Sequence, residues 1–262
     1  MCGIAGLIAN DPEARIGAML KTIEHRGRDD EGVWTSPPID DGGRQVCFGH
    51  RRLSIIDTSA AGHEPMFSRD GRFTLTFNGE IYNYRELRAE LEAKGHAFRT
   101  QTDIEVLLTA WQEWGEASLQ RLNGMFAFAL WDEKERALFL VRDHVGIKPL
   151  YYACQKPDRQ GGQAALTFAS EVKSILASKL IHADLNRESL HQFLTFLWVP
   201  DPNTLFRDIK TVPPGHLVKW RDGELTTRQW WDVSFDEIEH GRSEQWWQER
   251  TLETLDRVVH LE

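Results

Sequence analysis

Four short, strand-like runs follow one another closely in the second half of the chain. They cover residues 125–131, 136–141, 149–153 and 165–169. Parallel neighbours in a sheet need a crossover of roughly a dozen or more residues, usually built around a helix. The short connections therefore predict antiparallel pairing, which restricts the chain to folds that are built on antiparallel sheets.

The remaining expected elements are grouped rather than strictly alternating. Further strands are expected at 3–9, 31–35, 45–50 and 73–77, with a hairpin at 216–230. Apolar residues at helical spacing predict helices at 12–26, 83–94, 103–114, 170–178, 187–197 and 243–260. Because regular βαβ alternation is missing, the pattern favours an α+β domain of two antiparallel sheets with outer helices.

The composition argues against several classes of protein. A formal charge of −9 without a basic cluster argues against a nucleic-acid partner, and no apolar run is long enough to span a membrane. The start of the chain lacks the positive region of a secretory signal peptide. Cys2, Cys47 and Cys154 lie far apart and form no CxxC pair, which argues against a disulfide framework. We therefore expect a reduced, cytoplasmic protein of enzyme size.

No motif for a metal or a nucleotide is present. The ten histidines include no HExxH and no tight cluster, so we expect no metal site. The sequence also lacks GxxxxGK[ST], GxGxxG and an SGG-type pyrophosphate loop. We therefore expect this chain to need no cofactor of its own.

Cys2 is the first candidate for chemistry. Removal of Met1 would make it the N-terminal residue, with a free α-amino group beside its own sulfur. The thiolate is the reactive form of cysteine, and a neutral amine can accept the thiol proton directly or through a water. This arrangement is the cysteine counterpart of an N-terminal threonine nucleophile.

Asn78 and Gly79 follow an alternating strand and precede Glu80 and a predicted helix. An Asn-Gly pair is a common hairpin turn, which is one interpretation. An oxyanion site is the other, because an amide NH2 and an exposed backbone N–H suit it, and Gly79 would let a substrate oxygen approach the main chain. The chemistry alone does not decide between them.

Two charged residues could hold the ends of an α-amino acid. Arg52 ends a predicted strand, where its guanidinium could bind a carboxylate in a bidentate manner or form a surface salt bridge. Asp103 opens a predicted helix, where it could cap the helix or accept hydrogen bonds from a substrate ammonium.

A series of ordered motifs carries a family resemblance. They are MCGIAG, HRGRDDEG, GHRRLSIID, FNGEIYN, TQTDIEV, GMFAFALWD, RDHVGIKPLYY, FASEVKSIL and VPPGH. Over about residues 1–230 the chain resembles the class II glutamine amidotransferases, and most closely the N-terminal glutaminase domain of asparagine synthetase. The resemblance implies the N-terminal nucleophile hydrolase fold, a four-layer αββα sandwich.

The resemblance also implies a role for each matching residue. Cys2 resembles the nucleophile that attacks the carboxamide of L-glutamine, with its own α-amine as the base. Asn78 and Gly79 resemble the oxyanion hole. The remaining substrate-binding positions are Arg52 for the α-carboxylate, main chain near Ile55 and Ile56 beside it, and Glu80 and Asp103 for the α-amino group. Water would then hydrolyse the thioester to glutamate.

Two features depart from the family pattern. Arg28 stands where the family usually has a proline, which predicts a looser loop. Residues 231–262 resemble a linker and the lead-in helix of a C-terminal synthetase domain that would bind ATP, magnesium and aspartate. The resemblance therefore implies a glutaminase domain at 2–230 that supplies ammonia to such a partner domain, and it leaves a homodimer open.

Two other functions stay open at this point. The chain could be the glutaminase domain of another amidotransferase, either one linked to polysaccharide or one that acts on phosphoribosyl or sugar-phosphate substrates. RDHVGIKPLYY and VPPGH disfavour the phosphoribosyl and sugar-phosphate enzymes. A non-catalytic regulatory domain with the same fold is the other alternative, and a retained Met1 would support it.

Overall fold

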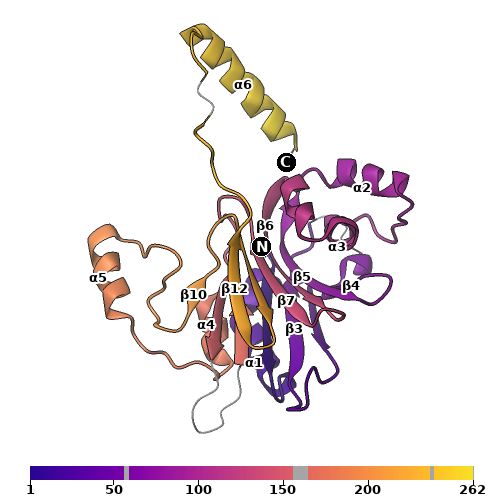
Figure 1. Cartoon of the computed structure of the whole chain (residues 1–262), viewed down its shortest axis with the longest axis vertical. Coiled ribbons are helices and arrows are strands. Elements are labelled where there is room, and N and C mark those ends of the chain that lie inside the picture. Colours follow the sequence, from indigo (N-terminus) through magenta and orange to yellow (C-terminus); the bar gives the residue numbers. More distant parts are fainter. Residues whose placement is uncertain (56–58, 156–164, 237–238, 262) are drawn as a thin grey trace.

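Two six-stranded antiparallel sheets form the centre of the molecule (Figure 1). The computed structural model describes residues 1–55, 59–155, 165–236 and 239–261. One sheet has the strand order β10-β8-β9-β1-β3-β2 and the other β12-β11-β7-β6-β5-β4. The antiparallel pairing predicted from the short connections is confirmed, since β6 to β7 and β8 to β9 are antiparallel neighbours.

The first sheet, called sheet A, contains the N-terminal strand that directly follows Cys2. Its strands are β1 (Gly3–Ala9), β2 (Asp30–Thr35), β3 (Gln45–Arg52), β8 (Tyr151–Gln155), β9 (Ala165–Ala169) and β10 (Lys210–Thr211). Sheet B consists of β4 (Met66–Phe67), β5 (Phe73–Ile81), β6 (Gly124–Asp132), β7 (Ala137–Arg142), β11 (His216–Arg221) and β12 (Glu224–Gln229).

Helices α1 (Glu13–Thr22) and α4 (Val172–Ala177) cover the outer face of sheet A, and α2 (Tyr84–Ala93) and α3 (Asp103–Trp114) cover the outer face of sheet B. The other helices are α5 (Arg187–Phe196) and α6 (Glu244–Leu261). Short 3-10 turns occur at η1 (Glu24–Arg26), η2 (Ala60–Gly62) and η3 (Gly115–Arg121). The predicted α+β sandwich with outer helices is therefore confirmed.

Three apolar clusters hold the four layers together. One joins α1 and α4 to sheet A, through residues such as Met19, Leu20 and Ile175. The central cluster lies between the two sheets and includes Phe48 and Trp131. The third joins α2 and α3 to sheet B. Burial of these faces is what drives the layers together, because each sheet is apolar on both sides.

The register of two strand pairs determines where chemistry can occur. Gly3 pairs with Arg51, so the residue before β1 lies beside the end of β3. In sheet B, Gly79 pairs with Phe126. Asn78 and Gly79 therefore lie within β5 rather than in a hairpin turn, and the hairpin interpretation of Asn-Gly is wrong.

Some element boundaries differ from the sequence-based expectation. The helix expected at 12–26 ends at Thr22 and is followed by η1, and the strand expected at 73–77 continues to Ile81.

Helix α6 stands away from the sandwich in Figure 1, and none of its residues is buried. Among the described helices, none combines the length and the apolar character that crossing a bilayer requires.

Candidate active site

The predicted site residues meet at one cavity between the N-terminus and the ends of β3 and β5. Its lining includes Cys2, Arg52, Ile55, Asn78, Gly79, Glu80 and Asp103. Ile56, the remaining predicted residue, lies outside the described residues. Residues that are up to a hundred positions apart in the sequence are thus brought together by the two sheets, and their roles stay predictions.

The backbone around Cys2 is fixed on two sides. Arg26 donates through Nε to the Cys2 carbonyl oxygen at 2.9 Å, and Ile4 donates its N–H to Ser170 Oγ at 3.0 Å. The Leu53 N–H, at the end of β3, lies 3.4 Å from the Cys2 sulfur. The register of β1 on β3 places Leu53 beside Cys2, and the bonds from Arg26 and to Ser170 hold the adjoining backbone, so the thiol has a defined place at the cavity wall.

The environment of Cys2 disfavours the thiolate while Met1 is attached. Burial, and then the negative charge of Glu64, raise the pKa of the Cys2 thiol to about 11, although the Leu53 N–H and Arg52 act in the opposite direction. At neutral pH only roughly one thiol in ten thousand would then be ionised. The site therefore depends on a base close to the sulfur.

Beside the cavity, the edge of β5 that faces away from β6 carries the backbone N–H groups of Phe77, Gly79 and Ile81. Two of these three have a hydrogen-bond acceptor. Phe77 donates its N–H to Glu64 Oε2 at 2.7 Å, and Ile81 donates to Asp103 Oδ2 at 3.0 Å. Because N–H groups alternate along an antiparallel strand, the N–H of Gly79 points to the same edge. Among the described strands, β4 pairs with β5 only at Thr74 and Leu75, so the Gly79 N–H opens on the cavity.

Asn78 presents a buried amide to the same cavity. Its side chain is only 1% exposed, and neither Nδ2 nor Oδ1 has a hydrogen-bond partner among the described residues. A buried amide without a partner costs free energy, so such groups are rare outside functional sites. The amide is thus free to donate to a ligand oxygen beside the Gly79 N–H.

The structure gives a different reason for the glycine at position 79 than the sequence suggested. A Cβ atom there would lie 2.7 Å from Phe126 Cα and would also collide with the Met125 carbonyl. A side chain would therefore push β5 away from β6, rather than block the approach of a substrate oxygen. Close packing of the two strands is what requires Gly79.

Arg52 lies in the wall of the cavity rather than at the protein surface. It is 6% exposed, and its Nη1 donates to the Ser59 carbonyl oxygen at 2.8 Å. Arg52 is therefore buried in the cavity wall, and its role in binding a carboxylate stays a prediction. Ile55 lines the opening of the cavity and is 69% exposed.

Asp103 is buried at the cavity and is not the residue that caps helix α3. Thr102 is the N-cap, and its Oγ1 accepts the Glu105 N–H at 3.3 Å. Burial raises the pKa of Asp103 to about 6, against the hydrogen bond from the Ile81 N–H, and the charge of Glu80 adds to the increase. Two carboxyl groups, those of Asp103 and the half-buried Glu80, thus face one cavity.

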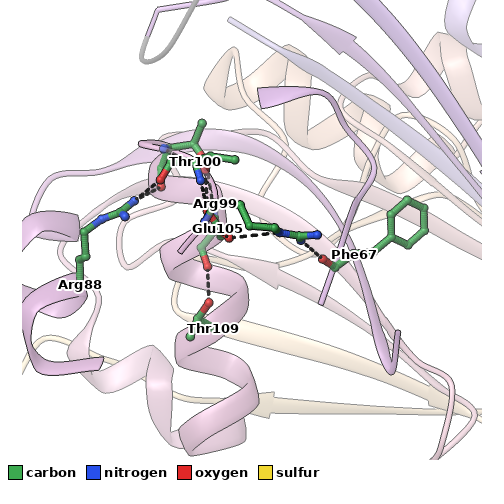
Figure 2. Close-up of polar contacts among 7 residues, drawn as sticks. Phe67, Arg88, Arg99, Thr100, Glu105 and Thr109 are labelled. Carbon is green, nitrogen blue, oxygen red and sulfur yellow. Dashed lines mark hydrogen bonds and ion pairs between the residues drawn. The ribbon is translucent and has the colours of Figure 1, made fainter. Parts of the chain in front are cut away.

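A network around Glu105 fixes the segment that leads into Asp103 (Figure 2). The buried Glu105 carboxylate accepts the N–H groups of Arg99 at 2.9 Å and Thr100 at 2.7 Å, as well as the Thr100 hydroxyl at 2.7 Å. Arg88 donates to the Thr100 carbonyl at 2.9 Å, and Thr109 donates to the Glu105 carbonyl at 2.7 Å. The start of α3 is therefore held rigidly, which positions Asp103.

The structure adds a buried pair that the sequence did not reveal. Glu64 lines the cavity, and its Oε1 lies 3.4 Å from His50 Nε2, which also contacts the Phe77 carbonyl at 3.1 Å. Burial lowers the pKa of His50 to about 3 and raises the pKa of Glu64 well above its usual value. Glu64 and His50 therefore hold both polar groups of Phe77, immediately before Asn78.

Lys148 is the second residue that the sequence did not reveal. It lines the cavity together with Cys2 and is only 6% exposed. A lysine among apolar residues in GIKPLYY was the available signal, because lysine is rarely buried without a partner.

The expected absence of a metal site stays a prediction, although the described residues contain no group of three potential metal ligands.

Comparisons with known proteins identify the family to which the chain belongs. The sequence profile of the glutamine amidotransferase domain matches residues 1–231. The chain is 38% identical over 247 residues to a glutamine-hydrolysing asparagine synthetase 1 of Bacillus subtilis, covering 91% of this chain and 37% of that relative. A putative glutamine-hydrolysing asparagine synthetase of Mycobacterium tuberculosis is 38% identical over 231 residues, with 85% and 34% covered.

A solved structure supports the fold independently. The glutamine phosphoribosylpyrophosphate amidotransferase of B. subtilis superposes with a TM-score of 0.64 at 18% identity, over 87% of this chain and 49% of that chain. The chain spans about a third of the length of the curated relatives it matches. With the profile covering nearly the whole described sandwich, the chain belongs to the glutamine amidotransferase domain family.

Proposed function

We propose that the chain, after removal of Met1, hydrolyses L-glutamine to glutamate and ammonia through a thioester on Cys2. The observation that carries this proposal is the Asn78 amide, buried and without a partner among the described residues, beside the Gly79 N–H and in one cavity with a thiol. Membership of the amidotransferase domain family supports the same reaction.

The first half of the reaction forms the thioester. The Cys2 sulfur attacks the carboxamide carbon of glutamine, and the thiol proton passes to the α-amino group of Cys2. The carbonyl oxygen becomes an oxyanion that accepts hydrogen bonds from Asn78 Nδ2 and the Gly79 N–H. The protonated amine then gives its proton to the leaving nitrogen, so that the C–N bond breaks and ammonia departs.

The second half regenerates the enzyme. Water attacks the thioester carbon, the neutral α-amine takes a proton from that water, and the same two donors stabilise the second oxyanion. The C–S bond then breaks, the sulfur regains a proton, and glutamate leaves. No step of this proposal uses a metal or a cofactor, and the expectation that the chain needs none stays a prediction.

Charges around the cavity match the two ends of an α-amino acid. Arg52 supplies a fork of donors for the α-carboxylate, while Asp103 and Glu80 supply acceptors for the α-ammonium group. Both ends would be held within a few ångströms of the thiol. Such two-point binding selects L-glutamine over simple amides.

We propose in addition that the ammonia serves a synthetase domain of the asparagine synthetase type. The relatives that suggest this are named as glutamine-hydrolysing asparagine synthetases, and the chain matches only about a third of their length. ATP and magnesium would bind that partner domain and activate aspartate. The expected homodimer and the cytoplasmic location stay predictions.

Glutamate release tests the proposed function directly. A preparation whose intact mass shows that Met1 has been removed is expected to produce equal amounts of glutamate and ammonia from L-glutamine. It should release little ammonia from D-glutamine or from propionamide. Equal turnover of all three amides would contradict the proposed two-point binding.

Replacement of Asp103 by Asn has opposite expected effects on binding and on stability. The ionised carboxylate is the form that binds an ammonium, so the wild-type KM for glutamine should rise as the pH falls below about 6. Asp103→Asn should raise KM about tenfold at pH 7.5 and remove this dependence on pH, because a charge-assisted hydrogen bond contributes roughly 1.5–3 kcal/mol.

The same substitution should stabilise the fold at neutral pH. Because the pKa of Asp103 is about 6 in the folded protein and near 3.8 when exposed, the folded state binds its proton more tightly. This group therefore lowers the free energy of unfolding as the pH rises from about 4 to about 6, by on the order of 3 kcal/mol. Urea unfolding at pH 5 and pH 8 measures this, and a variant less stable than wild type at pH 8 would contradict it.

A further inference from the structure

Lys148 is held at the cavity by a rigid turn after β7. The buried Asp143 carboxylate accepts the N–H groups of Phe126, Val145, Ile147 and Lys148, the last at 2.9 Å. A carboxylate that accepts several backbone N–H groups fixes the path of the chain through the turn. The backbone of Lys148 therefore has little freedom to move away from the cavity.

Arg142 closes the same turn from the other side. Its Nε donates to the Lys148 carbonyl oxygen and its Nη2 to the Gly146 carbonyl oxygen, at 2.9 and 2.8 Å. Both the N–H and the C=O of Lys148 are thus occupied. The side chain is directed by this backbone into the cavity that contains Cys2.

The ammonium group of Lys148 has no hydrogen bond or ion pair with any residue in the described part of the chain, although only 6% of the residue is exposed. Its Nζ is not among the fully buried atoms that lack a partner, so the ammonium meets the open space of the cavity, while the rest of the side chain is buried. A lysine buried to this extent usually has an ion pair. The position of Lys148 in the cavity wall, rather than in a salt bridge, indicates that its partner forms or arrives within the cavity.

The charges that act most strongly on Lys148, together with the cavity that it shares with Cys2, point to that partner. Burial lowers the pKa of Lys148, and among the charges that oppose this effect Cys2 is the largest, ahead of Glu80 and Asp143. Burial also lowers the pKa of the α-amino group of Met1, and Arg26 and Lys148 both add to that effect. Lys148 is thus within electrostatic reach of both the sulfur and the start of the chain.

We infer that the ammonium group of Lys148 is the counter-ion of the anion that forms on the Cys2 sulfur, and that it keeps the neighbouring α-amino group in its neutral form. This inference rests on the proposed function only for its consequence in catalysis. A positive charge favours loss of a proton from both groups, so one residue serves the nucleophile and the base together.

Lys148 acts against a largely negative background. The other titratable and charged groups that act on Cys2, on the start of the chain or on Lys148 come from several elements: Arg26, Asp29, Arg52, Glu64, Glu80 and Asp143. Glu64 raises the pKa of the thiol, while Arg52 lowers it and already donates to the Ser59 carbonyl. Lys148 is the cation of this set that retains no partner within the described structure.

The test measures the reactivity of the Cys2 thiol without glutamine. On the chain that lacks Met1, the rate of carbamidomethylation by iodoacetamide is followed between pH 5 and pH 12, and peptide mass spectrometry separates Cys2 from Cys47 and Cys154. Lys148→Met should move the midpoint for Cys2 to higher pH by about one unit, because a cation in the same cavity favours the ionised form of the thiol.

Three further variants make the result specific. Lys148→Arg keeps the charge and should leave the midpoint within about 0.3 units of wild type. Lys134→Met removes an equal charge at the turn beyond the opposite end of β6 and should have no effect. Lys148→Gln, with thermal unfolding of each protein, provides a second neutral side chain if Lys148→Met does not fold.

The acid limb of kcat/KM for glutamine should shift in the same direction and by the same amount in Lys148→Met. An unchanged Cys2 midpoint in both neutral variants would overturn the inference, even if glutamine turnover were lost. A large increase in KM with no shift in either pH profile would overturn it too, because Lys148 would then bind the substrate carboxylate. A shifted midpoint in a protein without glutaminase activity would support the role of Lys148 and contradict the proposed function.

Discussion

Cys2→Ala is expected to abolish glutamate release while the fold stays intact. The substitution removes the atom that forms the thioester, and loss of a nucleophile in comparable enzymes lowers kcat by roughly 10⁴-fold or more. Cys2 is only partly buried and its sulfur contacts the backbone of Leu53, so the free energy of unfolding should change by about 1 kcal/mol or less. Glutamate release and thermal unfolding, measured on the same preparation, separate the two effects.

Met1 provides the matched control for Cys2. With Met1 attached, the thiol pKa of about 11 leaves almost no thiolate at pH 7.5, and the nitrogen of Cys2 is an amide that cannot act as a base. Molecules that retain Met1 should therefore be as inactive as Cys2→Ala. Turnover that does not decline with the fraction of molecules lacking Met1 would contradict the role of the α-amine.

Asn78→Ala should lower kcat for glutamine by about 10²–10³-fold with KM changed less than about threefold. Removal of one oxyanion donor has an effect of this size in other acyl-transfer enzymes. The amide contacts the carbonyl oxygen only as it becomes charged, whereas Arg52, Asp103 and Glu80 hold the ends of the substrate. Steady-state kinetics across glutamine concentrations separate kcat from KM.

Asn78→Ala should lower the free energy of unfolding less than truncation of a hydrogen-bonded buried amide usually does. Asn78 has no hydrogen-bond partner among the described residues, so its truncation breaks no internal bond. Thr76→Val is a matched control, because Thr76 is buried on the same face of β5 and its hydroxyl also lacks a partner in the described structure. Equal losses of activity in Thr76→Val and Asn78→Ala would contradict a specific role for the amide.

The layers of the fold could be predicted because local pattern and tertiary packing agree. Short connections required antiparallel strands, and the apolar faces of the predicted helices are those that pack on the two sheets. The end of β5 could not be predicted from local preference. Asn-Gly favours a turn in isolation, but pairing of Gly79 with Phe126 keeps both residues in the strand.

The candidate site was predictable where a residue lies next to a recognisable signal. Cys2 is marked by its place in the sequence, and Arg52 and Asp103 by the ends of elements that the pattern revealed. The roles of Glu64 and Lys148 depend on Phe77 and on the cavity at Cys2, which only the assembled sheets bring near them. The apolar neighbours of Lys148 could have indicated its burial, but no local pattern shows which residues Glu64 and Lys148 approach.

The most direct test of the central claim is covalent labelling with 6-diazo-5-oxo-L-norleucine, a diazoketone analogue of glutamine. Intact mass and peptide mapping should show one adduct per molecule, on Cys2, and only in molecules that lack Met1. L-Glutamine should protect against labelling, and Cys2→Ala should remain unlabelled. An adduct on another residue, or labelling of molecules that retain Met1, would contradict an N-terminal cysteine nucleophile.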